Sequence, residues 1–95
     1  MRKIFKLEKK AAIKILFALN ELGECRVTDL MRLLKEKYQT GSNTFYSSLK
    51  ILENLTLIEE RRFRSTKGGP IRRVIRLTDK GRKVTNFLIK INELL

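Results

Sequence analysis

The chain has 95 residues, 42% hydrophobic and 34% charged, a composition that suits one small folded domain rather than separate catalytic and regulatory bodies. Lysine and arginine number 22 against 10 aspartates and glutamates, so the net charge of +12 favours polyanionic partners, above all nucleic acid. Without histidine and with Cys25 as the single cysteine, the sequence argues against an enzyme, an internal disulfide and a thiolate zinc cluster. We expect neither a metal nor a cofactor.

The longest unbroken apolar run is short, from Ile15 to Leu19, whereas a membrane-spanning helix needs about 20 apolar residues. Charged residues interrupt the apolar segment near the N-terminus, which therefore suits a helix better than a signal peptide. We expect no membrane partner and a cytoplasmic, nucleoid-associated protein.

The first predicted helix spans about residues 7–22, because apolar residues recur there at steps of three and four. That series consists of Ala12, Ile15, Leu16, Leu19 and Leu22. Gly23 follows at a position where helices commonly end. Ile13 and Phe17 lie on the other side of this helix, which indicates a second contact surface.

A short second helix is predicted over about residues 28–38, because Thr28 suits an N-cap position and an acid follows it in the first turn. Residues 39–42 have turn composition, and a third helix follows over residues 42–54, with Ser42 as its expected N-cap. Its inward side consists of Phe45, Leu49 and Leu52. A helical wheel places small polar groups and one cation on the opposite side, namely Asn43, Ser47, Lys50 and Asn54, flanked by Thr44 and Ile51.

Two extended runs, residues 59–64 and 71–77, predict an antiparallel hairpin. Gly68 and Gly69 allow positive φ at its turn, and Pro70 suits the mouth of a hairpin because it cannot donate to a ladder. The second run alternates, which predicts that its odd-numbered members, Ile71, Arg73, Ile75 and Leu77, share one face.

Most of the positive charge lies in and around this hairpin. Residues 61–83 hold ten basic side chains against Asp79 alone, which accounts for +9 of the total. Because only one acid lies within the segment, we expect its arginines to face water or phosphate. Solubility would also explain a charged hairpin, but the planar guanidinium of arginine is better matched to phosphate.

A last helix is predicted from about residue 79 to residue 95, with Thr78 as its N-cap. It carries apolar residues on more than one face, at Val84, Phe87, Leu88, Ile91, Leu94 and Leu95. A monomer buries only one side of such a helix, so we expect the rest to form a dimer interface, although packing against the first helix would explain some of them. Ile13 and Phe17, with Ile4 and Phe5, are candidates to complete that interface.

Three segments form a pattern of known type: GSNTFYSSLKILENLTLI at residues 41–58, GGPIRR at residues 68–73 and IRLTDKG at residues 75–81. Together they resemble the winged-helix transcription regulators, most closely the PadR-like and MarR-like groups, and the resemblance covers nearly the whole chain. It implies one domain over residues 1–95, mainly α with a small β-hairpin, in the winged helix-turn-helix order α-α-α-β-β-α. In such regulators the helix matching residues 42–54 enters the major groove of double-stranded DNA. The hairpin over residues 59–77 is then a wing on the backbone or minor groove, and the terminal helices usually build a homodimer.

The resemblance also implies site residues. Base contacts would come from Asn43, Thr44 and Ser47, with Lys50 on bases or phosphate. Backbone and wing contacts would come from Ser42, Tyr46, Arg61, Arg62, Arg64, Lys67, Arg72, Arg73 and Arg76, with packing as the main role of Tyr46. Thr56 stands where the family commonly has glycine, so we expect an altered or strained turn there.

The predicted function is therefore a sequence-specific, homodimeric DNA-binding transcription regulator without an evident small-molecule effector. An architectural DNA-coating protein would share the charge but show little preference between sequences, and is the main alternative. RNA binding is disfavoured because the aromatic residues mostly fall on core-facing positions, and a protein adaptor would not need so basic a hairpin. Cys25 is expected to be a small packing residue, with oxidant sensing as the alternative.

Overall fold

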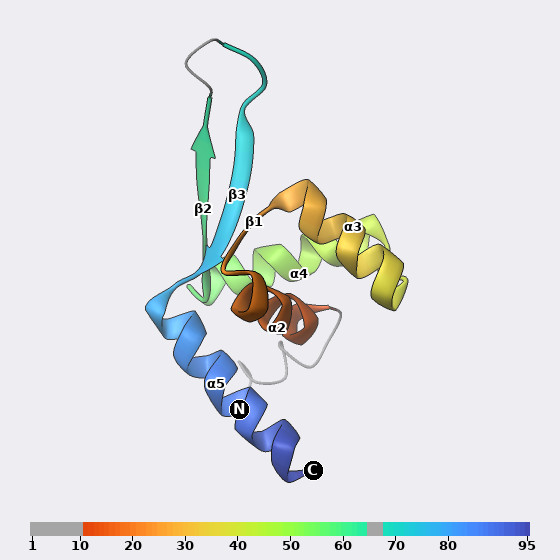
Figure 1. Ribbon diagram of the computed structural model, residues 1–95, viewed down its shortest axis with the longest axis vertical. Coiled ribbons are helices and arrows are strands. Elements are labelled where there is room, and N and C mark those ends of the chain that lie inside the picture. Colours follow the sequence, from red (N-terminus) through yellow and green to blue (C-terminus); the bar gives the residue numbers. More distant parts are fainter. Residues whose placement is uncertain (1–10, 65–67) are drawn as a thin grey trace.

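The computed structural model describes residues 11–64 and 68–95 (Figure 1). The start of the predicted first helix, Ile4, Phe5 and Lys67 lie outside the described residues. The described elements are α2 (Ala12–Leu22), β1 (Glu24–Arg26), α3 (Val27–Tyr38), α4 (Ser42–Asn54), β2 (Ile58–Phe63), β3 (Arg72–Leu77) and α5 (Asp79–Leu94). The mainly helical fold class and the order of the helices and hairpin are confirmed.

The strands form one antiparallel sheet in the order β1-β3-β2. The predicted hairpin is present, with Ile58 opposite Leu77 and Phe63 opposite Arg72. Strand β1 is an addition that we did not predict; its three residues pair with Arg76, Ile75 and Val74 of β3. Figure 1 shows β2 and β3 rising away from the helices at one end, while α5 extends from the other end.

The core lies where α2, α3, α4 and the lower part of the sheet meet, and α3 contributes Val27, Leu30 and Leu34. From α2 it takes Ala12, Ile15, Leu16 and Leu19, from α4 Phe45, Leu49 and Leu52, and from the sheet Ile58, Ile75 and Leu77. Leu22, expected in the same stripe, is 51% exposed, because it occupies the last position of α2, before the chain turns into β1. The core therefore fixes α4 by one side and the hairpin by its base.

Two of the three predicted helix caps are wrong. Helix α3 begins at Val27, with Arg26 as its N-cap, because Arg26 is paired in β1 and the helix starts where that strand ends. Helix α4 has Gly41 as its N-cap and already includes Ser42, and neither helix has a side-chain cap. The Thr78 cap is confirmed, since its Oγ1 accepts a hydrogen bond of 3.0 Å from the Gly81 N–H.

The turn after α4 contains the strain expected at Thr56, whose φ is 59°. A β-branched residue resists this left-handed conformation. Surrounding hydrogen bonds hold the turn in place: the Thr56 N–H donates to the Glu53 carbonyl at 2.9 Å, and the Thr78 hydroxyl donates to the Thr56 carbonyl at 2.7 Å. This turn directs β2 away from α4, so its geometry sets the angle of the hairpin.

We expect Thr56→Gly to stabilise the fold by up to about 1 kcal/mol, because glycine adopts positive φ without the steric cost, less the greater freedom of glycine in the unfolded chain. Chemical denaturation at a fixed protein concentration measures this. Gln39→Gly is the matched variant, because Gln39 has a similar φ of 57° but is not β-branched, so its gain should be smaller. A loss of stability in Thr56→Gly would show that the threonine contacts outweigh the strain.

Candidate nucleic-acid interface

The outer side of α4 is polar and accessible, as the helical wheel predicts. Asn43 and Lys50 are exposed, whereas Ser47 on the same side and Thr44 at its flank are half-buried. Ser42, at the first position of the helix, is also exposed. The structure thus presents all the predicted base-contacting side chains from one element, at the side opposite the core.

Ser48 anchors this helix to α2. Its side chain is fully buried, and its hydroxyl accepts a hydrogen bond of 2.9 Å from the Ala11 N–H while donating to the Thr44 carbonyl at 2.7 Å. A buried hydroxyl with both roles satisfied ties the start of α2 to the first turns of α4. The polar side of α4 is consequently presented by a rigid support.

Tyr46 is a residue of α4 that also lies near Pro70 and Ile71 of the hairpin. Its ring meets Phe45 edge to face, with the ring centroids 5.3 Å apart, so the expected packing role is present. It also remains 42% exposed, which leaves the side chain accessible at the surface. The aromatic ring therefore packs on one edge and faces solvent on the other.

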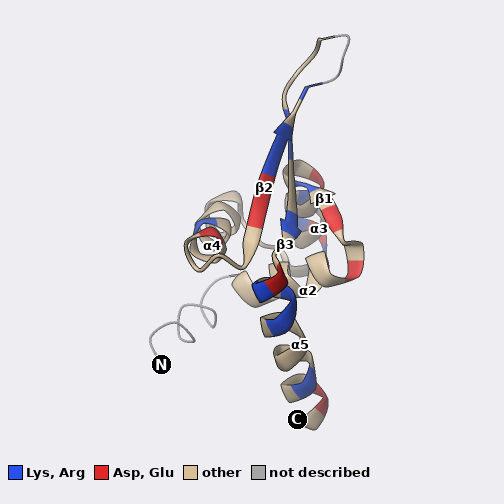
Figure 2. Cartoon of the chain, turned by 90° about the vertical axis from the view of Figure 1, so that its left-hand side faces the viewer, with Lys and Arg blue, Asp and Glu red and all other residues tan. Residues whose placement is uncertain are grey.

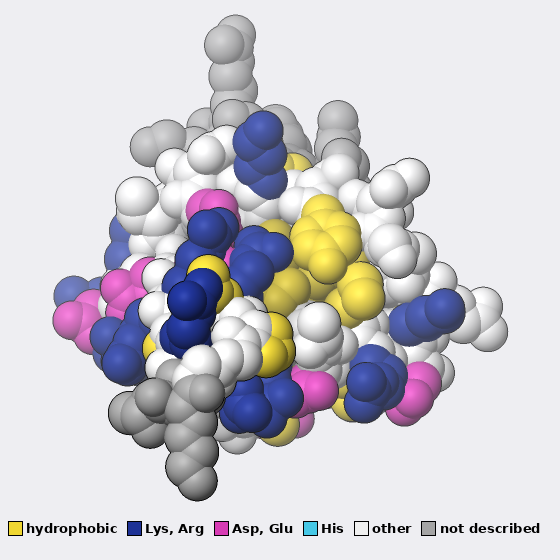
Figure 3. Space-filling model, turned by 90° about the horizontal axis from the view of Figure 1, so that it is seen from above, with side chains coloured by type: hydrophobic (Ala, Val, Ile, Leu, Met, Phe, Trp, Pro, Cys, Tyr) yellow, Lys and Arg dark blue, Asp and Glu magenta, His cyan; other side chains and the backbone are white. Residues whose placement is uncertain are grey.

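A groove of about 270 Å³ separates the hairpin from the start of α3 and from α4. Tyr46, Pro70 and Ile71 give it apolar walls, and Arg26, Arg72 and Arg73 contribute cationic groups. Seen from above the hairpin, hydrophobic side chains gather beside lysines and arginines on this face (Figure 3). The hairpin and α4 thus meet at this groove, where α4 contributes Tyr46 to the lining.

The hairpin arginines are exposed, as expected, but they are not without acidic partners. Four of them form ion pairs: Arg61 with Glu24 at 3.7 Å, Arg62 with Glu60 at 3.7 Å, Arg76 with Glu59 at 2.5 Å, and Arg73 with Glu60. The acids precede residue 61 in the sequence, but strand pairing brings them back. Glu59 lies directly opposite Arg76, and Glu60 lies opposite Ile75, two residues along the strand from Arg73. Figure 2 shows acidic residues on β2 beside basic ones of the hairpin.

These pairs affect titration. The hydrogen bond from Arg73 holds the pKa of Glu60 below its ordinary value, and Glu60 in turn raises the pKa of Arg73. Because the folded pKa of Glu60 is depressed, its stabilising effect is fully present above the ordinary pKa of a glutamate. This stabilisation is lost as the pH falls through the lowered pKa of Glu60.

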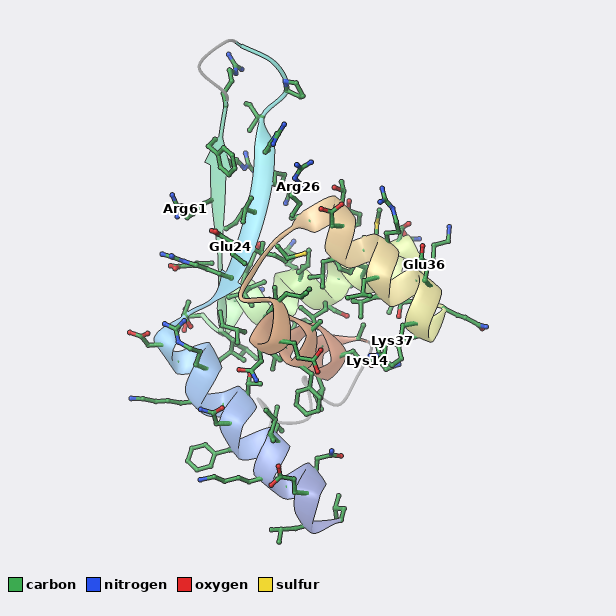
Figure 4. All side chains as sticks on the ribbon, viewed as in Figure 1. Lys14, Glu24, Arg26, Glu36, Lys37 and Arg61 are labelled. Carbon is green, nitrogen blue, oxygen red and sulfur yellow. The ribbon has the colours of Figure 1, made fainter. Side chains whose placement is uncertain are left out.

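Other cations at this surface remain without an acidic partner. Within residues 11–64 and 68–95, Arg26, Lys50, Arg64 and Arg72 form no ion pair, and all four are exposed. Figure 4 shows Arg26 beside the start of α3. We did not predict Arg26, because it stands alone in the sequence and only its place in β1 brings it next to the hairpin.

The predicted dimer residues fall into two groups. Ile13, Val84 and Leu88 are partly buried and pack against the chain's own core, and Phe17 is half-buried. Phe87, Ile91, Leu94 and Leu95 are 65%, 53%, 86% and 100% exposed. The outward side of α5 therefore presents a large apolar surface to solvent.

Two further features of the described residues concern chemistry. No three of their histidine, cysteine, aspartate or glutamate side chains are grouped as metal ligands. Cys25 is half-buried, its Sγ donates to the Arg26 carbonyl at 3.3 Å, and burial raises the pKa of its thiol, which disfavours the reactive thiolate. None of the described helices combines the length and apolar character needed to cross a membrane.

No protein-family model matches the sequence, and no curated protein does either. Solved structures match closely in shape. The reduced form of the transcriptional regulator YodB from B. subtilis superposes with a TM-score of 0.78 at 19% identity, over 95% of this chain and 81% of that one. A MarR-family protein from Enterococcus faecalis V583 gives 0.80 at 20% identity, over 97% and 77%.

A PadR-like transcription factor from Bacteroides fragilis gives a TM-score of 0.69 at 27% identity, over 99% of this chain and 86% of that one. The chain has a winged-helix fold. Helices α3 and α4 form its helix-turn-helix. The β2–β3 hairpin is its wing, residues 58–77, and β1 is the short third strand of the winged-helix sheet.

Proposed function

We propose that this winged-helix protein is a transcription regulator that binds double-stranded DNA and distinguishes between sequences. The observations that carry the proposal are the exposed Asn43 and Lys50 on the polar side of α4 and, across the groove that Tyr46 lines, a wing with unpaired arginines. The resemblance in fold to proteins named as transcriptional regulators supports it. Such a function places the protein in the cytoplasm, at the nucleoid.

In this proposal α4 enters the major groove. Asn43 can form two hydrogen bonds with an adenine edge, Thr44 and Ser47 can pair with several bases, and Lys50 can reach guanine or a phosphate. Short side chains give modest direct discrimination, so the shape of the DNA contributes the rest. Ser42 and Tyr46, at the edges of the helix surface, are placed to contact the backbone.

The wing contributes affinity. Arg64 and Arg72 are its unpaired cations within the described residues, and they would contact phosphates or the minor groove beside the site read by α4. Arg26 adds a third cation from β1, next to Arg72 at the groove. Contacts of this kind are insensitive to sequence and fix the orientation of the domain on the duplex.

The exposed side of α5 supports a homodimer. Phe87, Ile91, Leu94 and Leu95 form an apolar surface that a second copy would cover, and a two-fold pair would place two recognition helices in major grooves about 34 Å apart. A near-palindromic DNA site follows from that symmetry. The described part of α5 that packs inward, Val84 and Leu88, would hold the helix while the outward side pairs.

Selection of bound duplexes from a random pool tests the function. We expect an enriched, near-palindromic motif, and Asn43→Ala and Ser47→Ala should alter preference at individual positions, each costing about 1–3 kcal/mol for the preferred base. Arg72→Ala should instead weaken binding to all duplexes alike. Asn20→Ala, which removes an exposed amide from α2, is the control that leaves the motif unchanged. Binding without any enriched motif would indicate an architectural protein and refute sequence-specific regulation.

A further inference from the structure

The wing combines its arginines with acids in a way that a simple basic hairpin does not need. Arg62 and Arg73 lie directly opposite each other in the β2–β3 register, a like-charge pair that destabilises a hairpin. Glu60 lies on the same face and interacts with both: it accepts from Arg73, and its carboxylate is 3.7 Å from Arg62. Its side chain is only 17% exposed, the least accessible acid among these ion pairs.

The opposite face of the wing repeats the arrangement. Glu59 lies opposite Arg76 and accepts a hydrogen bond of 2.5 Å from its Nε. Residues 24, 61 and 76 share this face through the pairing of β1 and β2 with β3, and Glu24 lies 3.7 Å from Arg61. Both faces of the wing base therefore hold arginines against acids, whereas Arg64 and Arg72, further toward the tip, have no such partner in the described part.

We propose that Glu59 and Glu60 hold Arg76 and Arg73 within the wing and thereby lower the sequence-independent affinity of the protein for DNA phosphates. This inference rests on the proposed function. An arginine already paired with a carboxylate releases fewer phosphate counterions than a free one, because its charge is neutralised in advance. Specificity is the ratio between affinity for the preferred site and affinity for all other sites, so a restrained wing leaves more of the discrimination to α4.

The first measurement is made on the protein without DNA. Side-chain NMR of the arginine Nε–H groups should show slower exchange with water for Arg73 and Arg76, which donate to Glu60 and Glu59, than for Arg72. Glu60→Gln and Glu60→Asp should each accelerate the exchange of Arg73. Equal exchange rates for Arg72, Arg73 and Arg76 in the unaltered protein would overturn the proposal whatever the protein does with DNA.

The second measurement is the salt dependence of binding to random-sequence duplex. In Glu59→Gln/Glu60→Gln, the slope of log K against log salt should become steeper by about 0.9 for each released arginine that contacts a phosphate. The arginines paired with these two acids are Arg62, Arg73 and Arg76, so the upper limit is about 2.7 per protomer. Glu36→Gln, which removes an exposed acid from the far end of α3, is the matched charge control and should leave the slope unchanged (Figure 4).

Glu60→Asp separates restraint from net charge. It keeps the charge but shortens the side chain, so the carboxylate no longer reaches Arg73, and the slope should steepen as in Glu60→Gln. A change with Glu60→Gln but none with Glu60→Asp, an equal change with Glu36→Gln, or no change at all would each overturn the restraint. A protein that binds no duplex in its unaltered form would refute the proposed function instead, a result that the NMR measurement distinguishes.

Discussion

Gly81→Ala is expected to lower the free energy of unfolding by about 3 kcal/mol, at the upper end of what overpacking costs. A Cβ at this position would lie 1.9 Å from the Leu57 carbonyl oxygen and 2.9 Å from its carbonyl carbon. These are backbone atoms of the turn into β2, so no side-chain rotation relieves the clash. The same Leu57 carbonyl accepts a hydrogen bond of 3.0 Å from the Thr78 N–H, which fixes the oxygen in place.

The close approach holds the base of the wing against the start of α5. Gly81 is buried, and its N–H donates to the hydroxyl of Thr78, the N-cap of the same helix. Moving the helix away from Leu57 would therefore also break the hydrogen bonds from Thr78 to the Leu57 and Thr56 carbonyls. Because a domain of this size has only about 5–15 kcal/mol of stability, the loss should be visible as a lower midpoint in chemical denaturation.

Gly41→Ala is the matched control. Gly41 has an ordinary φ of −73°, and an added Cβ there would meet no heavy atom within 4 Å. Because Gly41 is an N-cap, its replacement by alanine should lower the free energy of unfolding by at most about 0.5 kcal/mol. If Gly81→Ala were as mild as Gly41→Ala, the first turn of α5 would have to be able to move away from Leu57 at little cost.

The helices and the hairpin could be predicted because their signals are local. The spacing of Phe45, Leu49 and Leu52 fixes the buried side of α4 and hence the accessible side that carries Asn43 and Lys50. The hairpin follows from two extended runs joined by glycines. These patterns involve neighbours within a few residues along the chain, where periodicity determines which side faces inward.

Features that depend on distant segments could not be predicted. Strand β1 is too short for a periodic signal and exists because β3 offers it an edge. The predicted alternation of buried and exposed residues holds at Ile75 and Leu77, which are buried. It fails at Ile71 and Arg73, which are exposed because they lie beyond the core, and at Val74, which is buried although it lies on the other face. The wing ion pairs require the β2–β3 register, because only the register brings Glu59 and Glu60 to arginines that are 17 and 13 residues away, respectively.

The wing ion pairs change the expected electrostatics of DNA binding. Counting every arginine of the wing as a phosphate contact would overestimate the salt dependence, since Arg61, Arg62, Arg73 and Arg76 are paired within the chain. Four of the described cations without an acidic partner border the groove, the outer part of the wing or the outer side of α4, namely Arg26, Lys50, Arg64 and Arg72, hence four in each protomer and eight in a dimer. The slope of log K against log salt should therefore be about −7 for a dimer, with about 0.9 for each phosphate.

Such a slope means that affinity for a duplex falls by about 10⁴-fold between 50 and 200 mM salt, the largest effect we predict. Fluorescence anisotropy with a labelled duplex that carries the selected site, titrated at several salt concentrations, measures it. If the four paired arginines also contacted phosphates, eight cations per protomer would be engaged and the slope would be near −14. The measurement therefore also tests whether the paired arginines stay paired on DNA.

Ile91→Glu makes the same measurement a test of the dimer. Ile91 is 53% exposed on the outward side of α5, where a buried, unpaired carboxylate at the interface of two copies would strongly oppose association. As a monomer the variant has four unpaired cations, so we expect a slope of about −3.6 and a decline of only about 150-fold over the same salt range. Sedimentation velocity should show the halved mass independently. A slope of about −3.6 in the unaltered protein, with no change in Ile91→Glu, would contradict the dimer. The apolar side of α5 would then not join two DNA-binding copies, and a near-palindromic DNA site would no longer be expected.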